Sequence, residues 1–316
     1  MMARMEPHTI IARTLSQITI GAPKAIDALT MIPLLGGPHV EQLPRYLTLD
    51  DAMARAWTEV TEISDQGSVP QLTVVNRAPQ PVFILDGEEL LGAKQNRVVN
   101  LSILVPPQAT LGIPVSCVEA GRWRARSRAF RASPRTQYAA GRARRMAQVS
   151  MAMRKTGDRH ADQADVWADI AAKSERMGVA SPTSAMEEIF SVHEGFTERC
   201  VEALQPEVGQ CGALFLIDGR VVGLDLFDSA VTLRCLLPKL VRGAAVDALE
   251  RRDRRHVALP LQSKVAENFL ETVESLPVHE SPALGLGCDL RLTAAAVSGA
   301  ALAHDGALVH LAAYVT

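Results

Sequence analysis

The chain has 316 residues, of which 47% are hydrophobic and 22% charged, with a formal net charge of −2. This much apolar side chain excludes a wholly disordered protein and allows a sizeable core. No uncharged apolar run approaches the roughly 20 residues that a bilayer-spanning helix needs, and residues 1–17 lack the features of a signal peptide. We therefore expect a globular protein with no membrane partner.

Five cysteines are scattered through the chain, and no two of them form a CxxC pair. An odd and dispersed set argues against a disulfide framework and against a zinc ribbon. The sequence therefore predicts a protein of the reducing cytoplasm.

The first elements in chain order are predicted to be short strands and turns over residues 9–45. Thr48 is a typical helix N-cap and is followed by acidic residues, which predicts a helix through Trp57. Over residues 71–117 the chain consists of β-branched runs interrupted by Pro, Gly and Asn, as is typical of strands.

Three Asp-Gly pairs each lie between two apolar runs, at Asp86-Gly87, Asp218-Gly219 and Asp305-Gly306. Asp-Gly accepts the positive φ angles of a type I′ turn, so each pair predicts a β-hairpin. The first two share a longer pattern, DGEELLG and DGRVVGL. That pattern fits either a degenerate internal repeat or one common turn used more than once.

Helical spacing of apolar residues predicts a helical block at about 137–204, in which Ser181-Pro182-Thr183 starts one helix. Further helices are expected at about 229–273. The first of them is predicted to be capped by Asp228 and to bend or restart at Pro238, and the second to cover 261–273. A last β segment is expected over 284–315.

Strands followed by helices and then by strands again indicate an α+β fold. We expect a β-hairpin-rich core with antiparallel or mixed sheets, arranged as a sandwich or a barrel. One domain is predicted over 1–316, made of a β-rich part (9–128), the helical block (137–204) and an α+β C-terminal part (210–316).

Charge is segregated along the chain. Residues 120–157 contain ten Arg, one Lys and no acidic residue, which leaves 22 basic against 35 acidic residues elsewhere. Within this window Arg122, Arg124, Arg126 and Arg128 alternate with other residues, so on a strand they would share one face. Such a face suits the binding of an anion. The alternative interpretation is a mobile, solvated basic loop.

Three other arginines of this window, Arg142, Arg144 and Arg145, are expected on a solvated helix face.

The densest polar cluster of the chain is the run Gly87–Arg97, GEELLGAKQNR. Gly92 permits a sharp bend that would bring residues 94–97 back across a hairpin. A Glu near Lys and Arg stays ionised and suits acid, base or metal-chelating chemistry. The alternative is a solvated loop whose charges simply pair with one another.

A second cluster surrounds Cys117 and Glu119, which would share one face of a strand. The following arginines would lower the pKa of the thiol and favour a cysteine nucleophile. No general base lies nearby in the sequence, and His39 and His310 are only distant candidates. A small buried hydrophobic residue is therefore the competing interpretation of Cys117.

Metal-binding motifs such as HxH and HExxH do not occur. No metal site and no cofactor are therefore predicted, and recruitment of a divalent ion by Glu88 and Glu89 stays open.

With its motifs DGEELLGAKQNR and PVSCVEAGRW, the chain resembles the bacterial ARPP domain family. The family is named for its association with ADP-ribosylglycohydrolases (ARG) and rhodanese-phosphatase-superfamily proteins. The resemblance covers about residues 15–315. It implies traffic in ADP-ribose or related nucleotide phosphates, and no particular reaction. Asp225, Phe227, Lys239 and His310 match its later motifs, and Cys288 departs from the acidic residue expected in GLGxDLRL.

Two sets of site residues are predicted. The candidate catalytic residues are Glu88, Glu89, Lys94, Cys117 and Glu119. The candidate ligand-binding residues are Gln95, Asn96, Arg97, Arg122, Trp123, Arg124, Arg126 and His310.

These residues predict binding and processing of a phosphate-bearing, nucleotide-derived small molecule by a hydrolase or transferase-type activity. Trp123 would stack on a base and the cations would hold phosphate. One alternative is a non-catalytic module that binds ADP-ribose or RNA. Another is a structural or homo-oligomeric partner protein without a ligand.

Overall fold

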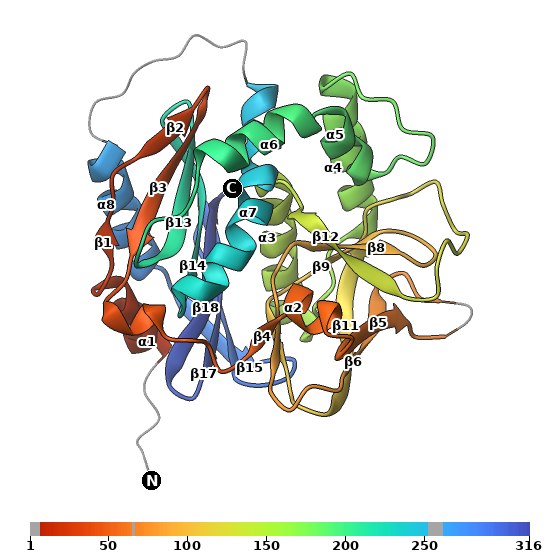
Figure 1. Cartoon of the computed structure of the whole chain (residues 1–316), viewed down its shortest axis with the longest axis horizontal. Coiled ribbons are helices and arrows are strands. Elements are labelled where there is room, and N and C mark those ends of the chain that lie inside the picture. The colour runs from red at the N-terminus through yellow and green to blue at the C-terminus, as the bar shows by residue number, and fades with distance from the viewer. Residues whose placement is uncertain (1–6, 65–66, 252–261) are drawn as a thin grey trace.

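A computed structural model gives the structure of the chain and describes residues 7–64, 67–251 and 262–316. A nine-stranded antiparallel sheet, the large sheet, has the order β1-β3-β13-β14-β18-β17-β16-β15, with β2 also paired to β3 (Figure 1). Its strands are β1 (Thr19–Ile20), β2 (Lys24–Ile26), β3 (Leu29–Leu35), β13 (Gln210–Ile217), β14 (Arg220–Phe227), β15 (Val278–Pro282), β16 (Cys288–Thr293), β17 (Val297–His304) and β18 (Ala307–Val315).

Two smaller sheets form a second region, the small β unit. A six-stranded sheet has the order β12-β8-β9-β11-β6-β5, and a three-stranded sheet has the order β10-β7-β4. Their strands are β4 (Leu47–Thr48), β5 (Thr58–Glu62), β6 (Gln71–Asn76), β7 (Val82–Ile84), β8 (Glu88–Gly92), β9 (Arg97–Val99), β10 (Ile103–Val105), β11 (Ala109–Cys117) and β12 (Phe130–Thr136).

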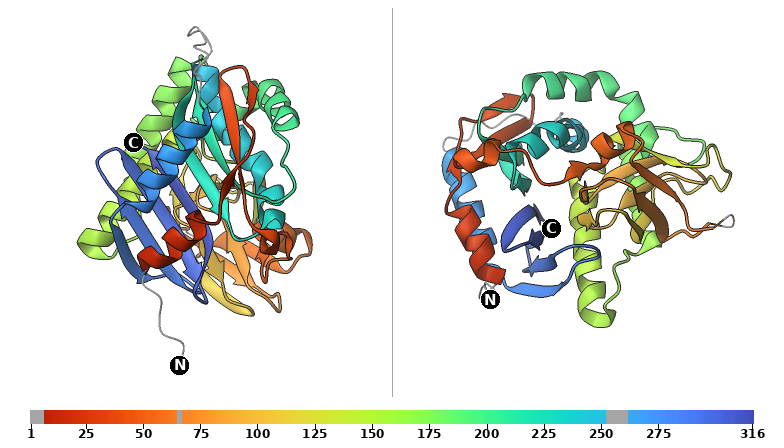
Figure 2. Two further views of the ribbon diagram at one scale, coloured as in Figure 1. Left: turned by 90° about the vertical axis from the view of Figure 1, so that its left-hand side faces the viewer. Right: turned by 60° about the horizontal axis from the view of Figure 1, so that its bottom comes forward.

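The helices of the described ranges are α1 (Pro7–Leu15), α2 (Leu49–Ala54), α3 (Ala139–Thr156), α4 (Gln163–Arg176), α5 (Met186–Val192), α6 (Glu194–Ala203), α7 (Ala230–Glu250) and α8 (Gln262–Glu274), with a 3-10 turn η1 at Pro38–Glu41. Helices lie on both faces of the large sheet, whereas α2 packs on the small β unit. Strand β3 shows why both faces are covered, since Ile32 and Leu34 pack with α1 and α8 while Leu29 and Met31 pack with α6 and α7. Figure 2 shows α3, in yellow-green, between the large sheet and the small β unit.

These features confirm the predicted α+β fold with hairpin-rich antiparallel sheets. The helical block consists of α3 to α6, within the predicted 137–204. Thr48 caps α2 by accepting a hydrogen bond from the Asp51 N–H. Two Asp-Gly hairpins are also confirmed, because Asp218-Gly219 joins β13 to β14 and Asp305-Gly306 joins β17 to β18, with positive φ at all four residues.

The hairpin predicted at Asp86-Gly87 is wrong. The preceding strand, β7, pairs with β4 and β10, whereas β8 pairs with β9 and β12 in the other small sheet. Asp86-Gly87 is therefore a crossing between two sheets, and of the pair only Gly87 has a positive φ. The local turn pattern was present, but tertiary pairing decided where the next strand went.

The predicted arginine-rich strand is also wrong. Residues 120–129 form an irregular loop, and β12 begins only at Phe130. Alternation fails because Arg122 folds back onto Glu119 and because the Arg126 N–H donates to the Ala93 carbonyl at 2.9 Å.

Several helix boundaries differ from the prediction. Helix α1 occupies part of the region expected to form strands and turns, and α5 begins at Met186 rather than near Ser181. Helix α7 is capped by Ser229, not by Asp228, and it continues through Pro238 as one helix of 21 residues.

The five cysteines are all free thiols. None of the helices in the described ranges is both long and apolar enough to cross a bilayer.

Candidate functional site

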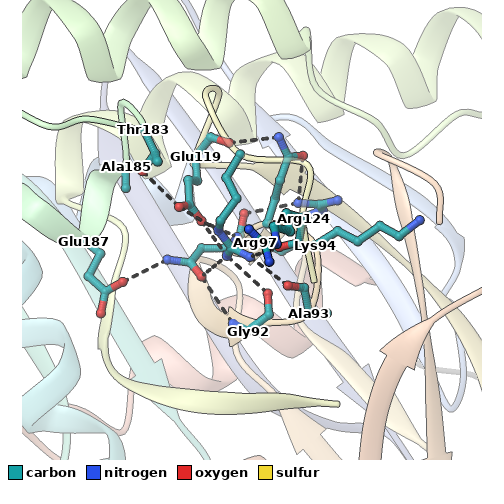
Figure 3. A network of polar contacts seen from close by, with 12 residues as sticks. Gly92, Ala93, Lys94, Arg97, Glu119, Arg124, Thr183, Ala185 and Glu187 are labelled. Carbon is teal, nitrogen blue, oxygen red and sulfur yellow. Dashed lines mark hydrogen bonds and ion pairs between the residues drawn. The ribbon is translucent and has the colours of Figure 1, made fainter. Parts of the chain in front are cut away.

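The β8–β9 hairpin carries the densest motif of the chain and is the centre of a polar network (Figure 3). Gly92 has a φ of +126° and Ala93 one of +40°, so the chain reverses there, as predicted from Gly92. The reversal pairs Leu90 with Arg97 and Glu89 with Val98. Because facing residues of an antiparallel pair share a face, Arg97 and Glu89 point to opposite faces of this sheet.

Arg122 is the buried anchor of the loop 120–129. Its Nε and Nη2 donate to the two carboxylate oxygens of Glu119 at 2.8 and 2.6 Å, and its Nη1 donates to the Ala93 carbonyl at 2.7 Å. Burial opposes ionisation of Glu119, but hydrogen bonds from Arg122, the Asn96 N–H and Thr183 outweigh it and lower the Glu119 pKa. The guanidinium of Arg122 is thus engaged by the protein itself, and Arg122 fixes the loop.

The outer face of the same loop carries exposed cations. Trp123 is 48% exposed, and the Lys94 Nζ lies 5.3 Å from its ring centroid. Arg124, Arg126 and Arg128 are exposed, and none of them forms an ion pair with an acidic residue of the described ranges. We call Lys94, Trp123 and these three arginines the arginine surface.

Arg97 lies beneath the Trp123 ring and is fully buried, with its Cζ 5.8 Å from the ring centroid. Its Nη1 donates to the Gln95 Oε1 at 3.1 Å, whereas its Nε and Nη2 have no hydrogen-bond partner among the described residues. The Cys117 thiol also donates to the Gln95 Oε1, at 3.1 Å. Burial raises the pKa of Cys117 although Arg97 opposes this, so the side chain is a thiol and not a preformed thiolate.

Glu89 lies on the other face of the hairpin and is fully buried. Its Oε2 accepts a hydrogen bond from Ser133 at 2.9 Å and lies 3.0 Å from the Arg135 Nε, whereas its Oε1 has no partner in the described part of the chain. Burial raises the pKa of Glu89 to about 7, even though Arg135 opposes the rise. Glu187, which is 28% exposed, lies 3.4 Å from Arg135 and connects this group to solvent.

Asn96 joins the two groups across the hairpin. Its Nδ2 donates to Glu187 at 3.0 Å, and its Oδ1 accepts from the Arg122 Nη2 at 3.2 Å. Glu89 and Arg122 therefore belong to one connected network, and both side chains are buried.

Glu88 points away from this network. It is buried against Lys239, with the Nζ 2.5 Å from the Glu88 Oε1 and 2.6 Å from the Asp50 Oδ2. The two adjacent glutamates therefore have different surroundings. Among the described residues no group of three or more His, Cys, Asp and Glu side chains is placed to hold a metal ion.

A second buried network lies where the small β unit and α3 meet the large sheet. The Asp225 carboxylate accepts hydrogen bonds from Arg142 at 3.0 and 2.7 Å and from the Tyr314 hydroxyl at 3.0 Å. Burial opposes the charge of Asp225, but Arg142 and His310 outweigh it and lower the Asp225 pKa. Beside it, the Arg145 Nη2 lies 2.5 Å from the Asp86 Oδ1.

This network corrects the prediction that Arg142 and Arg145 lie on a solvated helix face. Both are buried in α3, and only Arg144, at 52% side-chain exposure, faces outward. The partners that hold the buried arginines come from distant segments, so the helix sequence by itself carries no sign of them.

His310 belongs to the same network and not to the hairpin group. Its Nε2 lies 3.1 Å from the Asp225 Oδ1, and its Nδ1 lies 2.9 Å from the Ser102 Oγ. Phe227 stacks on the imidazole with 4.7 Å between ring centroids. No local sequence motif marks Ser102, Arg135 or Glu187, and only the family resemblance marks Asp225.

A narrow cavity of about 10 Å³ opens beside Ser102 and His310. Its lining also includes Leu101, Met146 and Leu302, together with the buried ion pair of Arg291 and Asp289. A larger cavity, of about 580 Å³, lies elsewhere, between β13, β14 and the ends of α4 and α7.

Comparison with known proteins gives one family assignment. No curated protein and no solved structure matches the chain. The family model for the ARPP-1 domain matches residues 17–314, nearly the whole chain. The chain therefore belongs to the ARPP-1 family, that of the ARG and Rhodanese-Phosphatase-superfamily-associated Protein domain.

Proposed function

We propose that the chain binds and processes a phosphate-bearing, nucleotide-derived small molecule such as ADP-ribose, and that the arginine surface is where it binds. The proposal places this activity in the cytoplasm of a bacterium. The family description supports the ligand class, because it names association with ARG and rhodanese-phosphatase-superfamily proteins.

The observation that carries the proposal is the set of three exposed arginines without acidic partners in the described ranges. Exposed guanidinium groups that are not neutralised by acidic neighbours suit the oxygens of an anion such as phosphate. Arg122, fixed by Glu119, holds the loop that carries them on the turn of the hairpin. This anchoring limits the conformational entropy that a ligand would have to remove on binding.

Trp123 supplies the second element of such a site. Its half-exposed ring lies next to Lys94, so a base that stacks on the ring would place its phosphates near cations. This combination favours a nucleotide over a bare inorganic anion.

The proton transfer in processing is assigned to Glu89, which lies on the opposite face of the hairpin from Arg97 and is connected to the loop of the arginine surface through Asn96. A carboxyl with a pKa near 7 can accept or donate a proton at neutral pH. The unpartnered Oε1 is the atom available for the transfer.

The test is calorimetric titration with ADP-ribose, ADP, inorganic phosphate and a single-stranded RNA at several salt concentrations. The double variant Arg124→Ala/Arg126→Ala is compared with Arg154→Ala/Lys155→Ala, which removes the same charge from the exposed end of α3. We expect ADP-ribose to bind with a salt-dependent affinity that only the first variant lowers, by about tenfold or more.

Each other outcome selects an alternative. Binding without turnover in a product assay, with Glu89→Gln binding like the wild type, would leave a non-catalytic module. Preference for RNA would identify the ligand as a nucleic acid. Absence of binding by all four probes would contradict the proposal and leave a structural or homo-oligomeric role.

A further inference from the structure

We propose that Ser102, His310 and Asp225 form a nucleophilic serine site that hydrolyses esters of a short acyl group. The three side chains come from the β9–β10 connection, β18 and β14, and they form one chain of hydrogen bonds. This site does not depend on the arginine surface or on its ligand.

The directions of the hydrogen bonds fit a general base. Asp225 is held ionised by Arg142 and can only accept, so the His310 Nε2 carries a proton and donates it to the Asp225 Oδ1. The Nδ1 then has its lone pair free to accept the Ser102 hydroxyl proton over 2.9 Å.

Ser102 is positioned for the same role. Its Oγ accepts the Asp86 N–H at 3.0 Å, which leaves its own proton for His310. The serine is partly exposed, whereas His310 and Asp225 are 1% exposed each. A reagent can therefore reach the hydroxyl while the base and the carboxylate stay shielded from water.

Positioning of the imidazole comes from both parts of the molecule. Phe227 of the large sheet stacks on it, and Phe83 of the small β unit lies against it with 5.8 Å between ring centroids. The serine contacts Nδ1 and the aspartate contacts Nε2, so the ring can take the serine proton on Nδ1 while Asp225 stabilises the imidazolium that forms.

The cavity beside Ser102 sets the substrate class. Its volume of about 10 Å³ is about that of a single water-sized group, so the site discriminates against all but the smallest acyl groups. Arg291 is the cation among the described residues that line this cavity, and Asp289 holds its Nε and Nη2 at 2.6 and 2.7 Å. We assign to Arg291 the role of stabilising the negative charge that develops on the carbonyl oxygen of the substrate.

The reaction balances with water as co-reactant. The Ser102 Oγ bonds to the carbonyl carbon as its proton passes to the His310 Nδ1. The bond from that carbon to the alcohol oxygen then breaks, and the alcohol leaves with the proton from His310. Water repeats the sequence at the acyl-serine, releasing the carboxylic acid and restoring the serine.

The experiment has two readouts on the full chain. Labelling by a fluorophosphonate, followed by peptide mass spectrometry, reports the nucleophile. Hydrolysis of p-nitrophenyl acetate against p-nitrophenyl octanoate reports the activity and the chain-length preference. The variants are Ser102→Ala, Ser102→Cys and His310→Gln, with the exposed Ser191→Ala as the matched control.

We expect labelling at Ser102, a loss of about 10³-fold or more in acetate hydrolysis for Ser102→Ala and His310→Gln, and none for Ser191→Ala. Ser102→Cys keeps a nucleophile and is expected to retain acyl-enzyme formation, which a purely structural serine would not predict. Label on another residue, or unchanged hydrolysis by folded Ser102→Ala, would overturn the proposal. If His310→Gln unfolds, comparison of fluorophosphonate labelling between the wild type, Ser102→Ala and Ser102→Cys still tests whether Ser102 is the nucleophile.

Discussion

Arg142 and Asp225 face each other across the boundary between α3 and the large sheet, joined by two hydrogen bonds of 3.0 and 2.7 Å. Both side chains are nearly completely buried. Removing one partner leaves the other charge buried without compensation, so Arg142→Ala is expected to lower the free energy of unfolding by about 3–5 kcal/mol.

The control for this variant is Arg144→Ala in the same helix. Arg144 is 52% exposed and pairs with Asp169 at 3.0 Å, so its loss is expected to cost about 0–1 kcal/mol. Urea unfolding of the two variants measures the difference. Equal stabilities would show that the boundary tolerates an unpaired carboxylate.

Gly87 is required by a close approach as well as by its backbone. Its φ is +81°, and an added Cβ would lie 2.7 Å from the Arg142 Cδ and Nε. Gly157 has a similar φ of +77°, with no atom within 4 Å of an added Cβ. We expect Gly157→Ala to cost about 1 kcal/mol, and Gly87→Ala to cost clearly more in the same unfolding assay.

Stability should depend on pH through Glu89. An unfolded glutamate ionises near its ordinary pKa of 4.5, whereas the folded protein retains the proton up to a pKa of about 7. The contribution of protonated Glu89 to stability is therefore complete below about pH 4.5 and is lost as the pH rises through about 7.

Glu89→Gln cannot ionise, so its stability relative to the wild type is expected to rise by about 3 kcal/mol between about pH 4.5 and 7. Denaturant unfolding across this range measures the difference, and Glu202→Gln controls for a charge lost at an exposed site. A difference that stays flat with pH would show that Glu89 titrates normally.

Trp123 is expected to contribute to affinity without contributing much to stability. If a base stacks on its half-exposed ring, Trp123→Ala should weaken ADP-ribose binding by about 1–3 kcal/mol, roughly 5- to 150-fold. Trp123→Phe keeps a stacking face and should retain most of the affinity. Calorimetry measures binding, and thermal melting checks that both variants stay folded.

Local signals in the sequence predicted a large part of the fold. Thr48 acts through its own helix, and Asp218-Gly219 acts within its own turn, so both predictions needed only neighbouring residues. Asp86-Gly87 carried the same turn signal, but its outcome depended on which sheet accepted the next strand. Nothing within a few residues of it records that choice.

The site was less predictable than the fold because its contacts are distant in sequence. Arg145 and Asp86 are 59 residues apart, and Arg142 and Asp225 are 83 apart. Helical spacing places these arginines on α3 but does not tell which side of α3 meets water. Ser102 shows the extreme case, since its partner His310 lies 208 residues away.

Strand β18 lies between β14 and β17 in the middle of the large sheet. During synthesis on a ribosome, both of those strands keep an open edge until residues 307–315 have emerged. Closure of the large sheet is therefore a late event, and nascent chains are expected to depend on chaperones that shield such edges until β18 is inserted.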